Sequence, residues 1–315
     1  MNKSQTFAMI RIENLTKYYK IGKESFLGIG DLNLNVEKGE IFGLLGTNGA
    51  GKTTTIKMLS TLLYPSSGTA YISGYDIRRD DKEIRKIIGV IFSDQMIYRQ
   101  LTGRANLEFY GDLYNVPNLD KRISELASFF DLEAWMNIRV ETYSKGMKLM
   151  LALMRGMIHN PSILFMDEPT LGLDPNKTLR MREKIIELKK SGMTIILTTH
   201  EMATAEVLCD RIAILDKGKL VAIDTPRNLR RKIPGKNILE IEFEKENDIK
   251  KLSDDFIVSQ DHKTALIPIA NSDQLNKKLK GIIDMNLSIK SINISEPSLE
   301  KVFNYFTEQS YFTKR

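Results

Sequence analysis

The stretch Gly46 to Thr54, with the sequence Gly-Thr-Asn-Gly-Ala-Gly-Lys-Thr-Thr, constrains the fold more than any other part of the chain. It matches the phosphate-binding pattern G-x-x-x-x-G-K-[ST], which requires a strand before the loop and a helix after it. The apolar run 41–45 precedes it, as in a buried parallel strand. Apolar residues at helical spacing follow it, namely Ile56, Leu59, Leu62 and Leu63. The sequence therefore predicts a strand, a phosphate loop and a helix that ends at the turn 64–68.

The residue types in this loop are those that phosphate binding needs. Glycines at 46, 49 and 51 let backbone N–H groups approach phosphate oxygens, and the helix N-terminus adds a positive dipole end. Lys52 supplies a charge to the β- and γ-phosphates, and the Thr53 hydroxyl can ligate Mg²⁺. The alternative is an ordinary glycine-rich turn with an exposed lysine, and the predicted strand and helix on either side favour the binding loop.

Composition indicates a globular protein of the cytosol. The 315 residues suggest about two domains, and 42% hydrophobic with 27% charged residues is ordinary for such proteins. No stretch approaches the ~18 uninterrupted apolar residues of a membrane span, and residues 1–7 are too polar for a signal peptide. The single cysteine, Cys209, excludes an internal disulfide and fits a reducing compartment.

The net charge of +6 does not identify a partner, because 40 acidic residues dilute the basic ones. Nucleic acid and an anionic membrane surface are both compatible with it. We interpret the densest basic run as a solvated linker around Pro234 and Gly235. The run consists of Arg227, Arg230, Arg231, Lys232 and Lys236.

Two further strands are predicted to end in polar residues. The apolar run 163–166 leads into Asp167 and Glu168, and the run 194–199 leads into His200. In an open α/β sheet, ligands bind outside the carboxyl ends of the strands. We therefore expect three strands to present the phosphate loop, the acidic pair and the histidine to one crevice.

The remaining pattern predicts the domain organisation. Strands are expected at 9–19, 32–36, 69–73 and 87–92, helices between 93 and 161 with Thr102 as an N-cap, and a closing hairpin at 212–223. Short elements follow at 239–243, near 252, 257 and 266, and at 272–283, 287–294 and 297–306. We predict an α/β domain over 1–230 with a helical subdomain at about 95–160, a basic linker at 231–236 and a small α+β domain at 237–315, for which interaction or dimerisation is the default role.

Five motifs in order resemble those of the ATP-binding subunits of ABC transporters, over roughly residues 9 to 230. They are the phosphate loop 46–54, Tyr-Ser-Lys-Gly-Met at 143–147, Phe-Met-Asp-Glu-Pro-Thr at 165–170, Leu-Gly-Leu-Asp at 171–174 and Thr199-His200. The segments 101–104 and 143–147 are similar to the bacterial exporter class that includes drug and antibiotic resistance pumps, and 298–303 resembles the end of its C-terminal extension. The resemblance implies an α/β P-loop NTPase core of the ABC type.

The resemblance also implies roles for individual residues. Tyr19 stacks on adenine, Asp167 holds Mg²⁺ through water, and Glu168 positions or deprotonates the attacking water. His200 contacts the γ-phosphate, Ser144 and Gly146 cap the γ-phosphate bound by the opposite subunit, and Asp174 lies at the dimer seam. The residues implied to bind ATP through the phosphate loop are Gly46, Thr47, Asn48, Gly49, Ala50, Gly51, Lys52, Thr53 and Thr54. If the resemblance is set aside, the alternative interpretation of Tyr19 is a tyrosine at the end of a strand, beside Tyr18. The alternative for His200 is a polar residue at the end of a strand.

The chain departs from the family pattern at several positions. The usual signature is Leu-Ser-Gly-Gly-Gln, and Tyr143, Lys145 and Met147 replace three of its members while Ser144 and Gly146 are retained. Leu149 and Met150 stand where polar and basic residues are common, and Thr47 where proline is common. Ser93 aligns with a glutamine that normally touches the Mg²⁺ water shell, and Gln95 is an alternative substitute. We expect weaker or water-mediated metal contact there.

Together these features predict an ATP-hydrolysing subunit that dimerises on ATP with an identical or related ATP-binding subunit and drives a separate ABC permease. Its cofactors are ATP and Mg²⁺, its location is cytoplasmic and peripheral on the inner face of the cell membrane, and no nucleic acid is expected. Two alternatives remain open at this stage. One is an ABC ATPase that acts on ribosomes or nucleic acid, and the other is a nucleotide-binding regulatory module that hydrolyses poorly.

Overall fold

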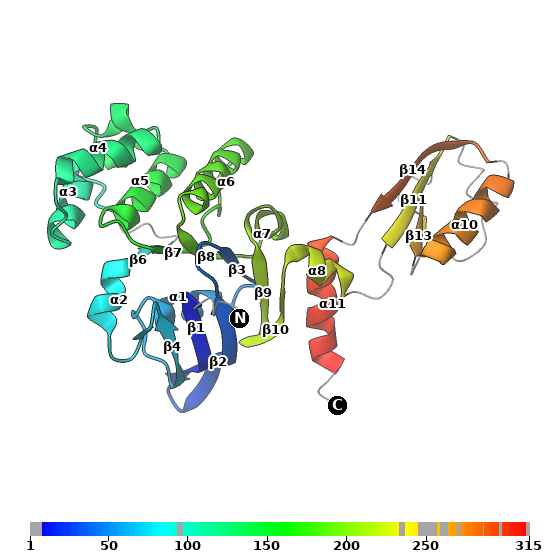
Figure 1. Ribbon diagram of the computed structural model, residues 1–315, viewed down its shortest axis with the longest axis horizontal. Helices are drawn as coiled ribbons and strands as arrows, with labels where there is room; N and C mark the ends of the chain where they lie inside the picture. The colour runs from blue at the N-terminus through cyan, green and yellow to red at the C-terminus, as the bar shows by residue number, and fades with distance from the viewer. Residues whose placement is uncertain are drawn as a thin grey trace, which may run out of the picture. The chain divides into compact units, whose positions relative to one another are not determined.

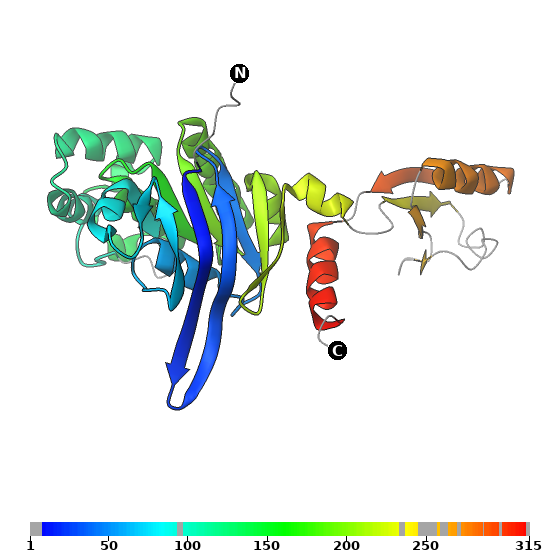
Figure 2. The same ribbon diagram turned by 60° about the horizontal axis from the view of Figure 1, so that its bottom comes forward.

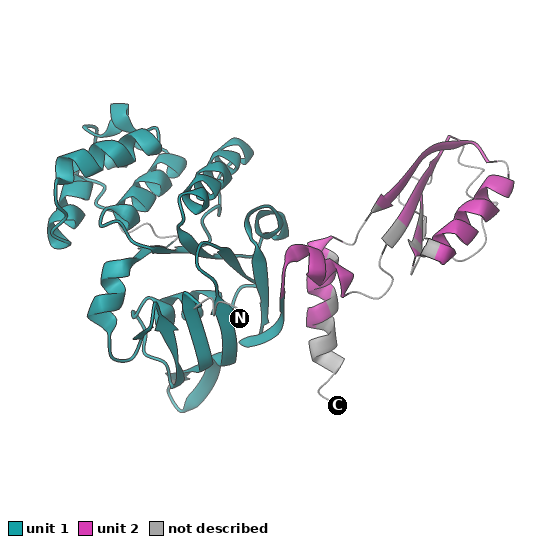
Figure 3. Cartoon of the chain, in the orientation of Figure 1, with its two compact units in different colours: residues 1–223 teal, residues 224–315 magenta. Residues whose placement is uncertain are grey.

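The computed structural model describes residues 8–92, 97–232, 237–244, 257–258, 264–269, 272–285, 287–295 and 298–312. They belong to two compact units, residues 1–223 and 224–315 (Figure 3). The first unit ends before the boundary at residue 230 that the sequence indicated. The difference arises because residues 226–231 are helical and belong to the second unit.

Unit 1 contains a four-stranded antiparallel sheet in the order β2-β1-β4-β5. Its strands are β1 (Ile10–Ile21), β2 (Glu24–Val36), β4 (Ser67–Ile72) and β5 (Tyr75–Asp76). Strands β1 and β2 form a long pair that projects past the rest of the sheet (Figure 2). The predicted strands at 9–19, 32–36 and 69–73 are confirmed, and the second begins earlier than expected because its residues from Glu24 to Ile29 pair with the end of β1.

The second sheet of unit 1 has six strands in the order β10-β9-β3-β8-β7-β6. They are β3 (Ile41–Gly46), β6 (Ile88–Ile91), β7 (Ile163–Asp167), β8 (Thr194–Thr199), β9 (Arg211–Asp216) and β10 (Lys219–Asp224). Every residue of β3, β7 and β8 is buried, and these three neighbouring strands run parallel. Their carboxyl ends therefore meet at one edge, as the sequence predicted.

Helices α3, α4 and α5 form a group at one end of unit 1 (Figure 1). The helices of this unit are α1 (Lys52–Leu59), α2 (Asp81–Ile87), α3 (Gly103–Leu113), α4 (Leu119–Phe129), α5 (Lys145–Met157), α6 (Pro175–Lys190) and α7 (Met202–Leu208). Two short 3₁₀ helices, η1 (Glu133–Trp135) and η2 (Val140–Thr142), lie between α4 and α5. Thr102 caps α3 by accepting from the Ala105 N–H at 3.1 Å, which confirms that prediction.

Helix α1 is shorter than predicted. It ends at Leu59 because Thr61 adopts a left-handed φ of 59°, after which the N–H groups of Leu62 and Leu63 turn back to the Lys57 carbonyl. Leu62 is consequently 59% exposed. The core of unit 1 contains side chains of both sheets together with apolar residues of α1, so α1 and the loop before it are held by packing.

Unit 2 contains a four-stranded sheet in the order β12-β13-β11-β14. Its elements are α8 (Pro226–Arg231), β11 (Asn237–Phe243), β12 (Ile257–Val258), β13 (Thr264–Ile269), α10 (Ser272–Asp284), β14 (Ile289–Ser295) and α11 (Leu299–Phe312). Three residues of the basic run, Arg227, Arg230 and Arg231, thus lie in a helix and not in a linker: Thr225 caps the helix, and Leu229 is fully buried. Residues 233–236 of the predicted linker lie outside the described residues. The helix expected near Leu252 lies outside the described residues.

Candidate functional site

The loop between β3 and α1 has a backbone that only glycine permits at two positions. Gly49 and Gly51 have φ values of 82° and 102°, in the left-handed region that disfavours a side chain. A Cβ atom at Gly51 would also lie 2.5 Å from the carbonyl oxygen of Gly28. The loop therefore packs against the backbone of β2 while it turns into α1.

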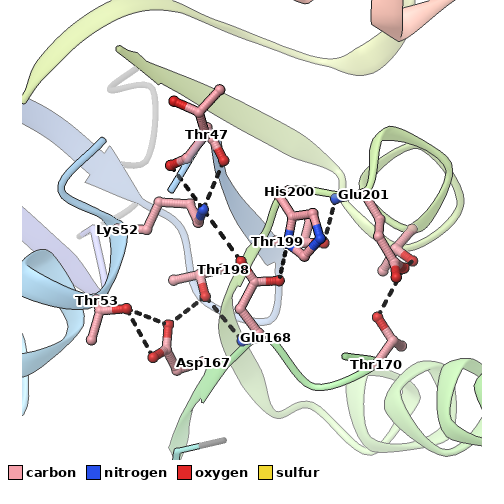
Figure 4. Close-up of polar contacts among 12 residues, drawn as sticks. Thr47, Lys52, Thr53, Asp167, Glu168, Thr170, Thr198, Thr199, His200 and Glu201 are labelled. Carbon is pink, nitrogen blue, oxygen red and sulfur yellow. Dashed lines mark hydrogen bonds and ion pairs between the residues drawn. The ribbon is translucent and has the colours of Figure 1, made fainter. Parts of the chain in front are cut away.

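Lys52, the first residue of α1, extends its side chain back into this loop. Its side chain is only 6% exposed, and Nζ donates to the carbonyl oxygens of Gly46 at 2.7 Å and Thr47 at 3.2 Å (Figure 4). The same ammonium group forms an ion pair with Oε1 of Glu168 at 3.2 Å. A buried charge requires such compensation, so Lys52 is fixed between the loop and the end of β7.

Asp167, the last residue of β7, accepts hydrogen bonds from two threonines. Thr53 Oγ1 donates to its two carboxylate oxygens at 3.0 and 2.9 Å, and Thr198 Oγ1 donates to Oδ1 at 2.6 Å. Among the described residues, no three His, Cys, Asp or Glu side chains gather as a metal site. The Thr53 hydroxyl and the Asp167 carboxylate are nevertheless oxygen donors of the kind Mg²⁺ prefers, with remaining ligands available from phosphate and water, so this pair fits that ion.

Glu168 has an unusual backbone for a non-glycine residue. Its φ is 53°, and its N–H donates to Thr198 Oγ1 at 3.0 Å. Its side chain is 13% exposed and bridges two partners, because Oε1 pairs with Lys52 while Oε2 contacts His200 Nδ1 at 2.9 Å. Such left-handed conformations persist where the surroundings over-determine them, and they cluster at functional sites.

A pocket of about 400 Å³ joins these groups to the end of β1. It is lined by Tyr19, Leu27, Gly28, Thr47, Asn48, Gly49, Gly51, Lys52, Thr53, Thr54, Asp167 and Glu168. The Tyr19 hydroxyl lies 3.1 Å from Thr54 Oγ1, and a Cβ atom at Gly28 would be 2.6 Å from the Tyr19 ring. The structure therefore brings Tyr19, most of the predicted loop residues and the acidic pair to one cavity. The predicted residues Gly46, Ala50 and His200 do not line it, and His200 is connected to it through Glu168.

The predicted residues Ser144, Gly146 and Asp174 lie elsewhere. Ser144 caps α5 by accepting from the Met147 N–H at 3.3 Å, and it lines a second pocket of about 740 Å³ together with Gly146. Asp174 caps α6 and pairs with Lys177 at 2.7 Å, and this partner lowers the pKa of Asp174. Ser93 and Gln95, the candidates for the missing glutamine, lie outside the described residues.

Comparison with known proteins assigns the chain to a family. Residues 29–171 match the model described as ABC transporter. The chain is 33% identical over 305 residues to the linearmycin resistance ATP-binding protein LnrL of Bacillus subtilis, covering 94% of this chain and 97% of that protein. The chain belongs to the family of ABC transporter ATP-binding subunits. As an ABC ATP-binding subunit it binds and hydrolyses ATP.

Other relatives agree with this assignment. The daunorubicin resistance ATP-binding protein DrrA2 of Streptomyces coeruleorubidus is 38% identical, covering 73% of this ABC subunit and 70% of its relative. Among solved structures, the dimeric ATP-binding cassette MJ0796 bound to ADP and Pi matches with a TM-score of 0.64 and 27% identity, covering 69% of this chain and 98% of that one. ABC ATP-binding subunits dimerise and act with membrane permeases.

Thr198 is a residue of this ABC site that sequence analysis missed. It is fully buried and joins Asp167 to the Glu168 N–H, yet a threonine inside an apolar strand carries no motif. The only signal was its place two residues before His200. We expect Thr198→Val to lower the free energy of unfolding by about 1–3 kcal/mol, because it removes a donor from a buried carboxylate.

Thr198→Ser is the matched variant, because it keeps the hydroxyl and loses one methyl group. Denaturant titration of both variants measures the difference. Wild-type stability of the valine variant would show that the hydroxyl contributes nothing to folding.

Proposed function

We propose that this chain is the ATPase subunit of a bacterial exporter, in which two ATP-binding subunits close on ATP and Mg²⁺ and drive a separate membrane permease. The observation that carries the proposal is the chain of contacts from Lys52 through Glu168 to His200. It connects a phosphate-binding cation and a carboxylate able to act on water, both of which line the pocket, to an imidazole that contacts the carboxylate. These are the groups that γ-phosphoryl transfer to water requires.

The binding roles follow from the pocket lining. The loop residues and Lys52 hold the phosphates, and Tyr19 offers its ring to the adenine at the far side of the same pocket. Thr53 and Asp167 hold Mg²⁺, which supplies charge compensation for the β- and γ-phosphate oxygens when bound.

The hydrolytic roles belong to Glu168 and His200. The Glu168 carboxylate orients a water molecule toward the γ-phosphorus and accepts its proton. With Nδ1 of His200 engaged by Glu168, Nε2 is the ring nitrogen left to contact the γ-phosphate. Catalysis then consists mainly of positioning and of charge stabilisation by Lys52 and the loop N–H groups.

The second pocket supports the dimeric part of the proposal. Ser144 and Gly146 line a cavity distinct from the one that holds Lys52, so they serve a nucleotide held by another subunit, with Asp174 at the seam. ATP then bridges both subunits, and hydrolysis removes the bridge.

The export role rests on the relatives, whose names refer to linearmycin and daunorubicin resistance. Neither of these two is named for a ribosomal or nucleic-acid role. No helix in the described part of the chain is both long and apolar enough to cross a bilayer. From the names of these relatives, we assign the chain to the inner face of the cell membrane, attached through its permease.

Affinity purification from detergent-solubilised membranes tests this assignment. We expect the tagged chain to co-purify a polytopic membrane protein that raises its ATPase rate when both are reconstituted in vesicles. An unrelated tagged cytosolic protein serves as the control. Recovery of ribosomes or nuclease-sensitive material in place of a membrane protein would contradict the exporter role and favour the nucleic-acid alternative.

A further inference from the structure

A second polar network lies behind the Glu168–His200 pair and is centred on Glu201. Oε2 of Glu201 accepts hydrogen bonds from Thr170 Oγ1 at 3.1 Å and from Thr204 Oγ1 at 2.7 Å (Figure 4 shows the Thr170 contact). Both threonines are buried, with exposures of 2% and 0%. The Glu201 N–H donates to Thr199 Oγ1 at 2.9 Å, which fixes the backbone beside His200.

The donors and acceptors of this network have one consistent direction. A carboxylate only accepts, and each threonine hydroxyl has one proton to donate. Because Thr204 gives its proton to Glu201, its lone pair receives the hydrogen bond from Arg182 of α6, at 2.7 Å. The Thr204 hydroxyl therefore bridges the Arg182 guanidinium and the Glu201 carboxylate. The Thr170 hydroxyl donates to the same carboxylate oxygen from the loop that follows β7.

The network connects the two loops that carry the hydrolytic residues. Thr170 follows Glu168 by two positions, and Glu201 directly follows His200. Glu168 has a left-handed φ of 53°, which must be held by its surroundings. Arg182 adds α6 to the connection, and α6 begins after Asp174, the residue expected at the dimer seam.

We propose that Glu201 is a positioning residue for ATP hydrolysis. It fixes the distance between the loop that carries Glu168 and the loop that carries His200, and it connects both loops to α6 through Thr204 and Arg182. The proposal rests on the proposed function, because it acts through Glu168 and His200. Glu201 does not line the nucleotide pocket, so its loss changes the chemical step and leaves nucleotide binding intact.

Steady-state kinetics of the full chain test this role with variants Glu201→Ala, Glu201→Gln, Thr170→Val and Thr170→Ser. We expect Glu201→Ala to lower kcat roughly ten- to hundredfold, the range for displaced catalytic groups, while KM for ATP changes less than about twofold. Glu201→Gln recovers part of kcat because it keeps an acceptor oxygen. Thr170→Ser keeps the hydroxyl and the wild-type rate, whereas Thr170→Val loses rate. Glu83→Gln, on the exposed surface of α2, is the control and leaves kcat unchanged.

Two further measurements make the result decisive. Melting temperatures show whether each variant is folded. If Glu201→Ala does not fold, the comparison of Thr170→Val with Thr170→Ser still tests the proposal, because both side chains are close in size to threonine. In a His200→Ala background, Glu201→Ala should lower kcat by much less than it does in the wild type, because the two residues act together. Wild-type kcat in both Glu201→Ala and Thr170→Val, or full additivity with His200→Ala, overturns the proposal. If Glu168→Gln retains turnover, the proposed function itself fails, so the two failures are distinguishable.

Discussion

Glu168→Gln is expected to reduce steady-state ATP hydrolysis by roughly 10²–10⁴-fold, the usual contribution of a general base, while ATP still binds. The amide keeps the size of the carboxylate but cannot take a proton from water. The phosphate loop, Thr53 and Asp167 are unchanged, so the variant should accumulate as an ATP-dependent dimer. Phosphate release measures the first effect, and light scattering on size-exclusion chromatography with and without MgATP measures the second.

The matched control for this variant is Glu83→Gln, which makes the same chemical change on an exposed part of α2. It should hydrolyse ATP at the wild-type rate and return to monomer as ATP is consumed. Wild-type turnover in Glu168→Gln would remove Glu168 from the role of base. A dead variant that shows no ATP-dependent dimer would instead contradict the assignment of ATP as the bridge between subunits.

Lys52→Ala is expected to weaken ATP binding by roughly 10- to 100-fold, the range for hydrogen bonds that involve a charged group. The substitution removes the ammonium that the loop holds beside Glu168, and it leaves that carboxylate without its cationic partner. Affinity for ATP is measured by isothermal titration calorimetry in the presence of Mg²⁺.

Lys57→Ala is the control for Lys52→Ala, since Lys57 is exposed and lies on the same helix. It should bind ATP as the wild type does, with both variants melting cooperatively. Unchanged affinity in Lys52→Ala would mean that the loop does not contact the phosphates through this side chain.

Much of the site could be predicted because its residues occupy the ends of predictable strands. The runs at 41–45, 163–166 and 194–199 are buried and contain no charged residue, and such runs form parallel strands whose carboxyl ends meet. The conformation of the loop could be predicted because its glycines and Lys52 match a pattern with a known backbone geometry. The direct contacts of Glu168 with Lys52 and His200 were not predicted, because they depend on the order of the strands in the sheet and on side-chain conformations.

The parts that could not be predicted depend on backbone choices or contacts that residue type does not determine. Helix α1 ends because Thr61 takes a left-handed conformation, which threonine rarely signals. Residues 226–231 form a helix whose residue Leu229 is fully buried, although the basic residues around it are typical of a solvated linker. The Glu201 network joins Thr170, Thr204 and Arg182, and only tertiary packing brings α6 to that carboxylate.

Tyr19 lies close to Gly28, and Gly28 lies close to Gly51. These close approaches constrain the dimensions of the pocket. The Tyr19 ring packs against the backbone of Gly28 in β2, and the Gly28 carbonyl group packs against Gly51 in the phosphate loop, with no side chain between the two glycines. The separation of Gly28 from the phosphate loop is therefore set by main-chain atoms, which cannot adapt as rotamers do. On the proposed role of Tyr19, this fixed separation would favour ligands of one length between the planar group and the anionic end.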